Sequence, residues 1–470
     1  MTANYEGLLR LCGMEADEIE RQAPRIEKVF NRIGIGSEDI ENAEKRVREQ
    51  HDVELLGVRK LLRAWMLELF DLVLAKDEGK KIFYYAYPCI QGPGMAIRAA
   101  APDELWVGCP DVVICHTVGQ LFNKLDPILE AGESRGLPPG HAMCSLQQIR
   151  NGGIDLGIIP IPDLTSGSSY YCEIASKTDE LLHEIYGYPV VFVDGSMDSR
   201  WGEFPDYDPE RVKFLGSQLD KLFSTVKETM GVEVTRETWG KALLATRQIF
   251  SAIGELTQLM MADPIPLSSV ETGLAINLAA ACTGISMSEG PDAVRSLCED
   301  VRERVERGEG IMEKGAPRVM NFVQPFSDAS ITHMIEDAGL ALGASITTVR
   351  PAKGDPPVPP ETLGEELAVK AMRGGAYHSN YGFVTRFEES IKTLNIDGLI
   401  YGYQYSCRPL AQCSHLFKQY IEENAGVPVL PLEMDYYESR SYGPEALRTK
   451  VETFAEMLKA RKANAASGQA

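Results

Sequence analysis

Basic residues are too few in this chain of 470 residues to balance the acidic ones. Lys and Arg number 47 against 68 Asp and Glu, so the formal net charge is −21. A protein that binds nucleic acid without sequence preference needs a basic face to neutralise phosphates, and an anionic membrane surface attracts the same kind of face. The charge balance therefore argues against nucleic acid and membrane surfaces as partners.

Long apolar runs are also missing. A membrane-spanning helix needs about 20 consecutive apolar residues, and no such run free of charges occurs here. The first residues, MTANYEGLLRLCGMEADEIE, are acidic and lack the apolar core of a secretory signal. We therefore expect a folded cytoplasmic protein, and 44% apolar residues suffice for two to three domains with ample core.

Closely spaced cysteine pairs, which are typical of structural zinc sites, are absent as well. The ten cysteines are dispersed along the chain, at positions 12, 89, 109, 115, 144, 172, 282, 298, 407 and 413. A chain of this size does not need disulfides to fold, so we expect reduced thiols. Dispersed thiolates on separate loops are what an iron–sulfur cluster accepts when the protein builds a cavity around it.

Short β-branched and aromatic runs alternate with helical stretches from residue 81 onward. The expected strands are KIFYYAYP, LWVG, IDLGIIPIP and YPVVFVDG in a first unit, and RVMNFVQPF, ITTVRP, IDGLIYGYQ and VPVLPLEMD in a second. Such alternation predicts parallel sheets with crossover helices. The expected fold class is α/β, with two stacked doubly wound parallel-sheet domains and a helical N-terminal segment.

Four segments are expected along the chain. They are a helical N-terminal segment at residues 1–80, a first α/β domain at 81–215, a helical connecting region at 216–315 and a second α/β domain at 316–470. The N-terminal segment carries apolar residues at mixed three- and four-residue spacing and ends near Gly79. It is either an interaction arm or a helical layer packed on the first domain, and packing is favoured.

The two α/β units share an order of parts. In the first, a strand leads to Cys172, a helical stretch, a Gly-Tyr-Pro strand and Asp194; in the second, a strand leads to Cys407, a helical stretch, a Gly-Val-Pro strand and Asp435. Ligands of open parallel sheets bind beyond the carboxyl ends of the strands. Both cysteines would then face one crevice, although a duplicated fold with cysteines as small core residues explains the order equally well.

Local context favours three of the ten cysteines as metal ligands. Cys172 and Cys407 follow strands, and Cys144 in GHAMCSLQQI lies where a loop meets a helix. The N-terminus of a helix stabilises a thiolate through its dipole and free N–H groups. Three ligands in place of four would leave one iron open to substrate.

Several segments of the chain resemble one family. The stretch from IDGLIYGYQYSCRPL to VETFAEML resembles the end of the 2-hydroxyacyl-CoA dehydratase and ATP-dependent (class I) benzoyl-CoA reductase subunits. The shared elements are an Asp-Gly-Leu-Ile strand, a Ser-Cys-Arg-Pro turn, a Gly-x-Pro strand, the stretch from Asp435 to Arg440, and a Leu-Arg-Thr-Lys-x-Glu helix. Upstream, VRERVERGEG, AMCSLQQIRNGG and SYYCEIASKTDELLHEIYGYPVVFVD also look like segments of this family.

The resemblance implies a cofactor, a substrate class and partners. Subunits of that family have stacked α/β domains with a three-cysteine [4Fe-4S] cluster at the domain junction, and its ligands carry over to Cys144, Cys172 and Cys407. The family acts on acyl-CoA, pairs two homologous subunits, and receives low-potential electrons from an ATP-hydrolysing iron–sulfur activator. The thioester carbonyl becomes a ketyl radical anion, which expels a hydroxyl group or, on an aromatic acyl group, takes up further electrons and protons.

One departure from the family pattern concerns the substrate. Dehydratase subunits that hold substrate have serines just before Pro-Cys-Glu-Leu, whereas this chain reads YYAYPCIQ at residues 84–91. The missing hydroxyl favours aryl-CoA reduction or the role of the partner subunit. The tyrosines either line an aromatic-substrate pocket or, as is commoner on a strand, belong to the core. Arg98, Arg150 and Arg408 are candidates for the CoA phosphates, with surface or ion-pair roles as the alternative.

Two other functions stay open at this point. A double-cubane iron–sulfur reductase of small molecules would be a homodimer and would need further thiols, for which Cys89, Cys109 and Cys413 are candidates. A non-catalytic subunit would only relay electrons, or would hold its cysteines as core residues. His378 in GGAYHSNYG is the histidine nearest to a close-approach glycine pair, but a turn residue is the simpler interpretation, so no catalytic acid or base is assigned.

Overall fold

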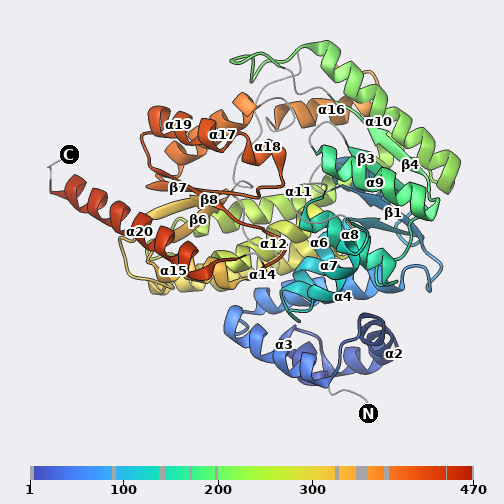
Figure 1. The fold of residues 1–470 in the computed structure, drawn as a ribbon, viewed down its shortest axis with the longest axis horizontal. Coiled ribbons are helices and arrows are strands. Elements are labelled where there is room, and N and C mark those ends of the chain that lie inside the picture. The colour runs from blue at the N-terminus through green and yellow to red at the C-terminus, as the bar shows by residue number, and fades with distance from the viewer. Residues whose placement is uncertain are drawn as a thin grey trace.

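The computed structural model describes residues 5–86, 91–136, 143–168, 172–195, 199–322, 328–345, 358–374, 380–440 and 442–467. Within these residues the chain is an α/β protein with mostly helical content and two four-stranded parallel sheets (Figure 1). The strand orders are β2-β1-β3-β4 and β6-β5-β7-β8, so the first strand of each sheet lies between its second and third strands. Ligands of open parallel sheets bind beyond the carboxyl ends of the strands.

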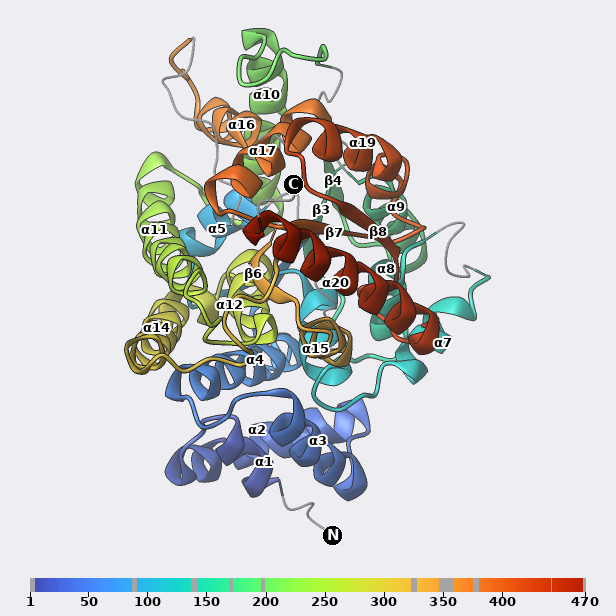
Figure 2. The same cartoon turned by 90° about the vertical axis from the view of Figure 1, so that its left-hand side faces the viewer.

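The first four helices lie at one end of the molecule (Figure 2). They are α1 (Glu6–Leu11), α2 (Ala16–Ile33), α3 (Ser37–Gln50) and α4 (Leu56–Leu74). Most residues of α4 are buried, including Trp65 and Phe70, which are fully enclosed. The preference for a packed helical layer over a free arm is therefore confirmed.

Three strands of the first sheet, β1, β2 and β4, lie within the expected strands KIFYYAYP, LWVG and YPVVFVDG. Its elements are β1 (Lys81–Tyr85), α5 (Gln91–Ala100), β2 (Leu105–Gly108), α6 (Pro110–Ile114), the π-helix η1 (Cys115–Gly119), α7 (Asp126–Glu133), α8 (Ser145–Asp155), β3 (Leu164–Ser168), α9 (Glu173–Tyr186) and β4 (Val190–Val193). Phe83 at the centre of β1 pairs with Val107 on β2 and Leu164 on β3. The sheet is buried on these central strands, as expected of parallel strands.

The strand expected at IDLGIIPIP, residues 154–162, is wrong. Helix α8 continues to Asp155, and Gly157 then turns the chain with a φ of 69°. Pro160 and Pro162 have no backbone N–H to donate to a sheet. The strand therefore starts only after the second proline, at Leu164.

Helices occupy the stretch of chain between the two sheets. They are α10 (Pro209–Met230), α11 (Arg236–Leu259), α12 (Ser269–Ala281), α13 (Ile285–Ser288) and α14 (Gly290–Arg307). These helices share one continuous hydrophobic core with the N-terminal helices and the first sheet. The apolar faces of all three regions are thus buried against one another.

The second sheet has a separate core on each face. Its elements are β5 (Arg318–Asn321), α15 (Ser330–Asp337), β6 (Ala341–Ser345), α16 (Leu363–Arg373), α17 (Asn380–Thr393), β7 (Gly398–Tyr403), α18 (Arg408–Ala411), α19 (Ser414–Asn424), β8 (Val429–Glu433) and α20 (Pro444–Ala466). Ile400 packs on the side of α15 and α20, whereas its neighbours Leu399 and Tyr401 pack on the side of α17 and α19. Successive side chains of a strand point to opposite faces, so both faces are covered.

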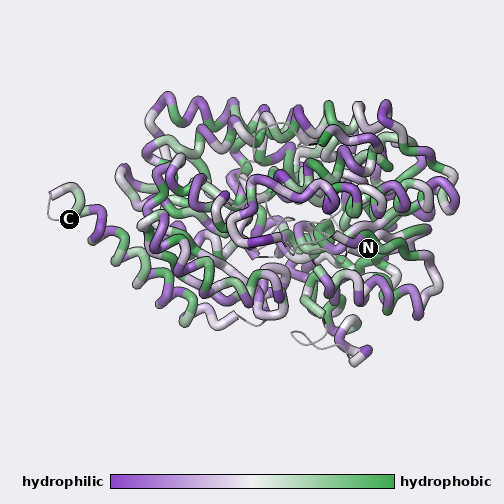
Figure 3. The backbone as a smooth tube through the Cα atoms, turned by 90° about the horizontal axis from the view of Figure 1, so that it is seen from above, coloured by the Kyte–Doolittle hydropathy of each residue, from purple (hydrophilic) through white to green (hydrophobic). Residues whose placement is uncertain are grey.

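The distribution of hydrophobic residues along the helices agrees with this packing. In Figure 3, hydrophobic and hydrophilic residues alternate along the helices, including α20, whose end projects beyond the body of the protein. The expected strand ITTVRP, residues 346–351, lies outside the described residues, and β6 ends just before it. Among the residues that the structure describes, no helix is both long and apolar enough to cross a membrane. The stacked, doubly wound arrangement and the four domain boundaries stay predictions.

Candidate metal centre

Each of the three cysteines selected from the sequence lies immediately before a helix. Cys144 is the N-cap residue of α8, Cys172 that of α9 and Cys407 that of α18, each with extended backbone there. These three thiols are partly buried, whereas the other cysteines that the structure describes are buried. The first N–H groups of a helix have no partner within it, so these positions favour negative charge.

An ion pair joins two of these helix starts. Arg408, the residue after Cys407, lies with its Nε 3.2 Å from Oε1 of Glu173, the residue after Cys172. The arginine side chain is 55% exposed. Because surface ion pairs contribute little to stability, this pair shows that the two cysteines are neighbours but does not hold them firmly.

A buried polar cluster joins the third helix start to the second sheet. Ser145, the residue after Cys144, donates a hydrogen bond of 2.6 Å to Oδ1 of Asp435, just beyond the carboxyl end of β8. Nε2 of Gln404 donates to the other carboxylate oxygen at 2.7 Å and to the Ser145 hydroxyl at 3.1 Å. We call Ser145, Gln404 and Asp435 the carboxylate bridge. It connects the first sheet's side of the molecule to the loop that carries Cys407.

The three thiols lie close enough to influence one another's ionisation. Burial raises the pKa of the Cys144 thiol well above its usual value, and Cys172 and Cys407 raise it further. Burial likewise raises the pKa of the Cys407 thiol to about 12, with Cys172 adding to the effect. The free thiols are therefore protonated at neutral pH, and a bound cation is needed to keep them as thiolates.

Helix N–H groups oppose part of this increase. The N–H of Gln147 lowers the pKa of Cys144, and the N–H of Leu410 lowers that of Cys407. Neither cysteine forms a side-chain cap hydrogen bond of ordinary geometry. The N–H groups therefore act through electrostatics, as they would on a metal-bound thiolate.

The three cysteines supply thiol donors, which are the ligand type of iron–sulfur clusters. Within the described residues, no three His, Cys, Asp or Glu side chains converge closely enough to hold one metal ion. Ligands of a cluster bind different irons, so their sulfur atoms need not meet at one point, and thiolates are the ligands that such clusters use. Three partly buried thiols from separate loops meet that requirement.

The cysteines proposed as extra ligands are engaged elsewhere or lie outside the described residues. Cys109 is buried and donates from its sulfur to the backbone oxygen of Tyr85 at 3.3 Å. Cys413 is buried in the core on the α17 and α19 face of the second sheet. Cys89 lies outside the described residues.

Cys115 is a fourth thiol near the site that the sequence did not single out. It begins the π-helix η1, is fully buried, and has a pKa raised by burial and by Asp111, Asp435 and Cys144. Its sulfur lies 4.0 Å from the backbone oxygen of Tyr437. The six-residue spacing from Cys109 carries no signal of this proximity, because the π-helix that places Cys115 is not visible in the sequence.

The internal repeat predicted the position of Asp435 but not its environment. Burial raises the pKa of the Asp435 carboxyl to about 6, although the hydrogen bond from Ser145 lowers it. Its counterpart in the first unit, Asp194, is exposed after β4. Of the two equivalent acids, only Asp435 takes part in the candidate site.

The candidate arginines for CoA phosphates differ in accessibility. Arg150 is fully buried and pairs with Asp111 at 2.9 Å and Asp179 at 3.3 Å, so it is a core residue and not a phosphate ligand. Arg98 is partly buried near Glu68, and burial lowers its pKa. Arg408 is the exposed member of the three.

The tyrosines of the YYAYPCIQ segment belong to the core where the structure describes them. Tyr84 is 1% exposed and donates to the backbone oxygen of Pro160 at 2.8 Å, and Tyr85 is fully buried and donates to that of Ala281 at 3.2 Å. They do not line an aromatic-substrate pocket. Residues 87–90 and His378 lie outside the described residues.

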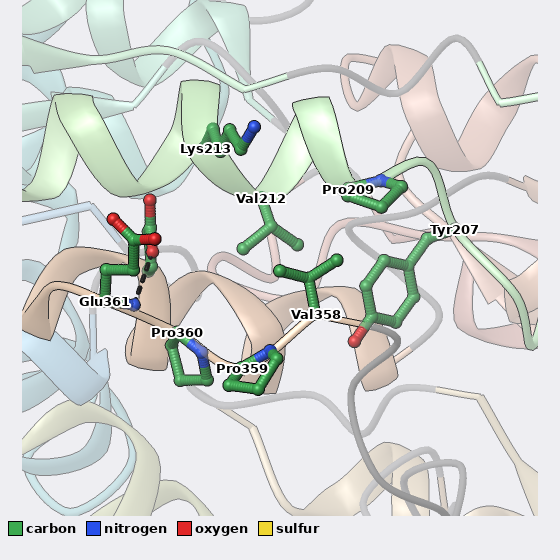
Figure 4. Close-up of a pocket in the computed structure, with 9 residues that line it drawn as sticks. Tyr207, Pro209, Val212, Lys213, Val358, Pro359, Pro360 and Glu361 are labelled. Atoms are coloured by element: carbon green, nitrogen blue, oxygen red, sulfur yellow. Dashed lines mark hydrogen bonds between the residues drawn. The ribbon is translucent and has the colours of Figure 1, made fainter.

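A separate pocket lies between the start of α10 and the segment before α16 (Figure 4). Val212 and Val358 line it, together with Tyr207 and three prolines. The backbone N–H of Glu361 donates to Oε2 of Glu365 at 2.7 Å at its edge. None of the three candidate cysteines contributes to this pocket.

Comparison with known proteins places the chain in a family. The family model described as "2-hydroxyglutaryl-CoA dehydratase, D-component" matches residues 99–458. This chain belongs to that family. The matched range includes Cys144, Cys172 and Cys407, and it confirms the resemblance drawn from the segments around them.

A curated relative agrees with this family. The chain is 20% identical over 316 residues to the protein named (R)-2-hydroxyglutaryl-CoA dehydratase, subunit alpha, of Acidaminococcus fermentans. The match covers 64% of this chain and 61% of the relative. Membership of the family rests on the family model, and the substrate does not follow from a relative at this identity.

Proposed function

We propose that this chain is the iron–sulfur subunit of an acyl-CoA enzyme of the dehydratase D-component family. In this proposal Cys144, Cys172 and Cys407 hold a [4Fe-4S] cluster and leave one iron for substrate. The observation that supports it is that three partly buried thiols, each just before a helix, interact electrostatically, and that the Glu173–Arg408 contact joins two of the helix starts. A bound cluster of this kind supplies one-electron transfer at low potential.

The residues of the chain prepare the site for this cofactor. Partial burial of the thiols limits access of water, and a drier site strengthens the interaction between thiolate and iron. The N–H groups of Gln147 and Leu410 stabilise negative charge on Cys144 and Cys407. Both features are expected of a low-dielectric cluster site and are not needed by a cysteine that only fills space.

The proposed substrate is an acyl-CoA thioester. The sequence YYAYPCIQ in place of the family's serines supports aryl-CoA reduction over dehydration, whereas the family match supports the dehydratase side. Tyr84 and Tyr85 are core residues and support neither reaction. The proposed partners are a homologous second subunit and an ATP-hydrolysing iron–sulfur activator. Of the candidate arginines, Arg408 is the exposed one and is the proposed contact for a CoA phosphate.

The first experiment measures iron in anaerobically reconstituted protein. We expect about four irons and four sulfides per chain, and a spectrum typical of a [4Fe-4S] centre. A value of roughly eight irons with no need for a second subunit would favour the double-cubane alternative, and absence of iron would contradict the proposal.

A second experiment separates the reaction types. The purified chain, its co-purified homologous subunit and the activator are supplied with ATP and a reductant, and then with either a 2-hydroxyacyl-CoA or an aryl-CoA. Loss of water from the first substrate identifies a dehydratase, and a ring-reduced thioester from the second identifies a reductase. Turnover of neither substrate by a cluster-loaded complex would support the electron-relay alternative.

A further inference from the structure

The carboxylate bridge is a buried, hydrogen-bonded connection between the two halves of the candidate site. Ser145, Gln404 and Asp435 are 1%, 2% and 3% exposed. Their hydrogen bonds, at 2.6 Å, 2.7 Å and 3.1 Å, form a closed three-membered ring. Hydrogen bonds to a buried carboxylate are stronger than neutral ones, and a buried network that is fully satisfied rigidifies its surroundings.

Each end of the bridge is attached to a candidate ligand. Ser145 follows Cys144 directly in the chain, so the position of its hydroxyl restricts the Cys144 backbone. On the other side, the backbone oxygen of Gln404 accepts the N–H of Cys407 at 2.9 Å. Asp435 therefore connects Cys144, which precedes α8 in the first α/β unit, to Cys407, which follows β7 of the second sheet.

The backbone of Asp435 is fixed as well. Its Oδ1 accepts the N–H of Tyr437 at 2.9 Å, and its backbone oxygen accepts a hydrogen bond from the hydroxyl of Tyr442. A carboxylate held on its own loop in this way can transmit a fixed geometry to the two groups that donate to it.

We propose that Asp435 is a positioning residue which, through Ser145 and Gln404, sets the placement of Cys144 relative to Cys407. This inference rests on the proposed function, because it gives the bridge a role toward the cluster ligands. Residues that orient metal ligands by hydrogen bonding change metal affinity about 10- to 100-fold when they are mutated. A bridge that only stabilised the loop would not produce a change in the cluster itself.

The deciding variants exchange the acid and the amide of the bridge. Gln404→Glu places a second carboxylate where Nε2 now lies 2.7 Å from Asp435, and two buried carboxylates at that distance repel each other unless they share a proton. Adding Asp435→Asn restores one acid and one amide. Glu133→Gln is the matched control, because Glu133 pairs with Arg440 across the same sheets and its side chain is 28% exposed.

The measurements are the rate of iron release to a chelator, the electron paramagnetic resonance spectrum of the reduced cluster and its midpoint potential. We expect Gln404→Glu to release iron about 10-fold faster or more, with a changed spectrum and potential, and the double variant to recover most of this loss. Glu133→Gln should behave as wild type. An unchanged cluster in Gln404→Glu, or a double variant no better than the single one, would overturn the inference.

Hydrogen exchange in metal-free protein provides a readout without the cluster. Amides in the first turn of α8 and in residues 404–411 should exchange faster in Gln404→Glu and return toward wild type in the double variant. If wild type binds no iron, the proposed function fails, whereas unchanged exchange in both segments refutes the positioning role by itself. Should Gln404→Glu not fold, Ser145→Ala, which removes one donor, is measured in the same two ways with the same criteria.

Discussion

Replacing the buried Arg150 by methionine should destabilise the protein strongly. The guanidinium donates to Asp111 at 2.9 Å, to Asp179 at 3.3 Å and to the backbone oxygen of Tyr85 at 3.1 Å. The arginine side chain is 1% exposed and both carboxylates are fully buried. Methionine keeps much of the length of the side chain but leaves two buried carboxylates without a cation.

The magnitude follows from these distances and from the burial. Two charges about 4 Å apart attract each other by about 4 kcal/mol at an effective dielectric constant near 20. Removal of one partner from a buried pair typically costs about 3–5 kcal/mol. We therefore expect Arg150→Met to lower the unfolding free energy at pH 7.5 by about 3–5 kcal/mol, which corresponds to a melting temperature lower by roughly 3–5 °C in a chain of this length.

The loss should depend on pH. In wild type, burial raises the pKa of the Asp179 carboxyl from 3.8 to about 6, against the opposing effect of Arg150. Without the arginine this pKa rises further, so the folded variant binds more protons than its unfolded chain down to about pH 4. The stability of the variant should therefore increase from pH 7.5 to pH 5.5, relative to wild type, as Asp179 becomes protonated.

Thermal unfolding at the two pH values is the assay, and a more exposed ion pair at the end of α8 provides the control. Arg135 pairs with Asp155 at the end of α8, and its side chain is 33% exposed, so Arg135→Met should cost less than about 1 kcal/mol. A triple variant with Asp111→Asn and Asp179→Asn should regain most of the lost stability. If Arg150→Met were as stable as Arg135→Met but lost CoA binding, the arginine would be a ligand residue and the reasoning would fail.

Three further predictions concern other parts of the chain. Glu68 is buried, and burial raises its pKa from 4.5 to about 7, so the folded state binds more protons than the unfolded chain between these pH values. Wild-type stability should therefore fall by about 3 kcal/mol as the pH rises through this range, and urea titrations of Glu68→Gln should lack this decrease. Gly152→Ala should cost about 3 kcal/mol and lower the melting temperature, because the new Cβ would lie 1.8 Å from the backbone oxygen of Ile128. Gly240 lies in a helix with open space around it, so Gly240→Ala should instead gain up to about 1 kcal/mol. Cys413→Ala should leave the iron content unchanged, and loss of iron would revive the double-cubane alternative.

Much of the fold follows from local patterns in the sequence. The strands around Ile82, Val107 and Ile400 are short apolar runs bounded by helices, and periodicity suffices to find them. The strand β3, with the sequence LTSGS, contains only one large apolar residue, so its neighbour GIIPIP outweighs it in any hydrophobic pattern. The pairing of β3 with β1 and β4 makes LTSGS a strand, and this tertiary effect overrides its local preference.

The candidate site was predictable in part for a similar reason. The positions of Cys172 and Cys407 follow from the rule that loops after parallel strands face one crevice, and Cys144 from its place before a helix. Asp435 follows a strand in the same way, but its burial against Ser145 depends on how the two sheets meet. The proximity of Cys115 depends on the π-helix and on packing between distant segments, which no local pattern records.

The sequence was least informative where a charged side chain could be buried or exposed. Arg150 and Arg408 are both arginines near a candidate cysteine, yet one is enclosed by two aspartates and the other lies 55% exposed. Residues Asp111 and Asp179, which decide the difference, are far from Arg150 in the chain. Pairing of buried charges is thus a property of the packed structure and not of a motif.

Iron analysis of single cysteine variants tests the proposed cluster site most directly. Wild type and Cys144→Ser, Cys172→Ser, Cys407→Ser and Cys298→Ser are reconstituted anaerobically and studied by iron determination and Mössbauer spectroscopy. We expect about four irons per chain in wild type and in Cys298→Ser, and loss or conversion of the cluster in each of the other three. Iron absent from wild type, or retained unchanged in any of those three variants, would contradict the assignment of Cys144, Cys172 and Cys407 as the ligands.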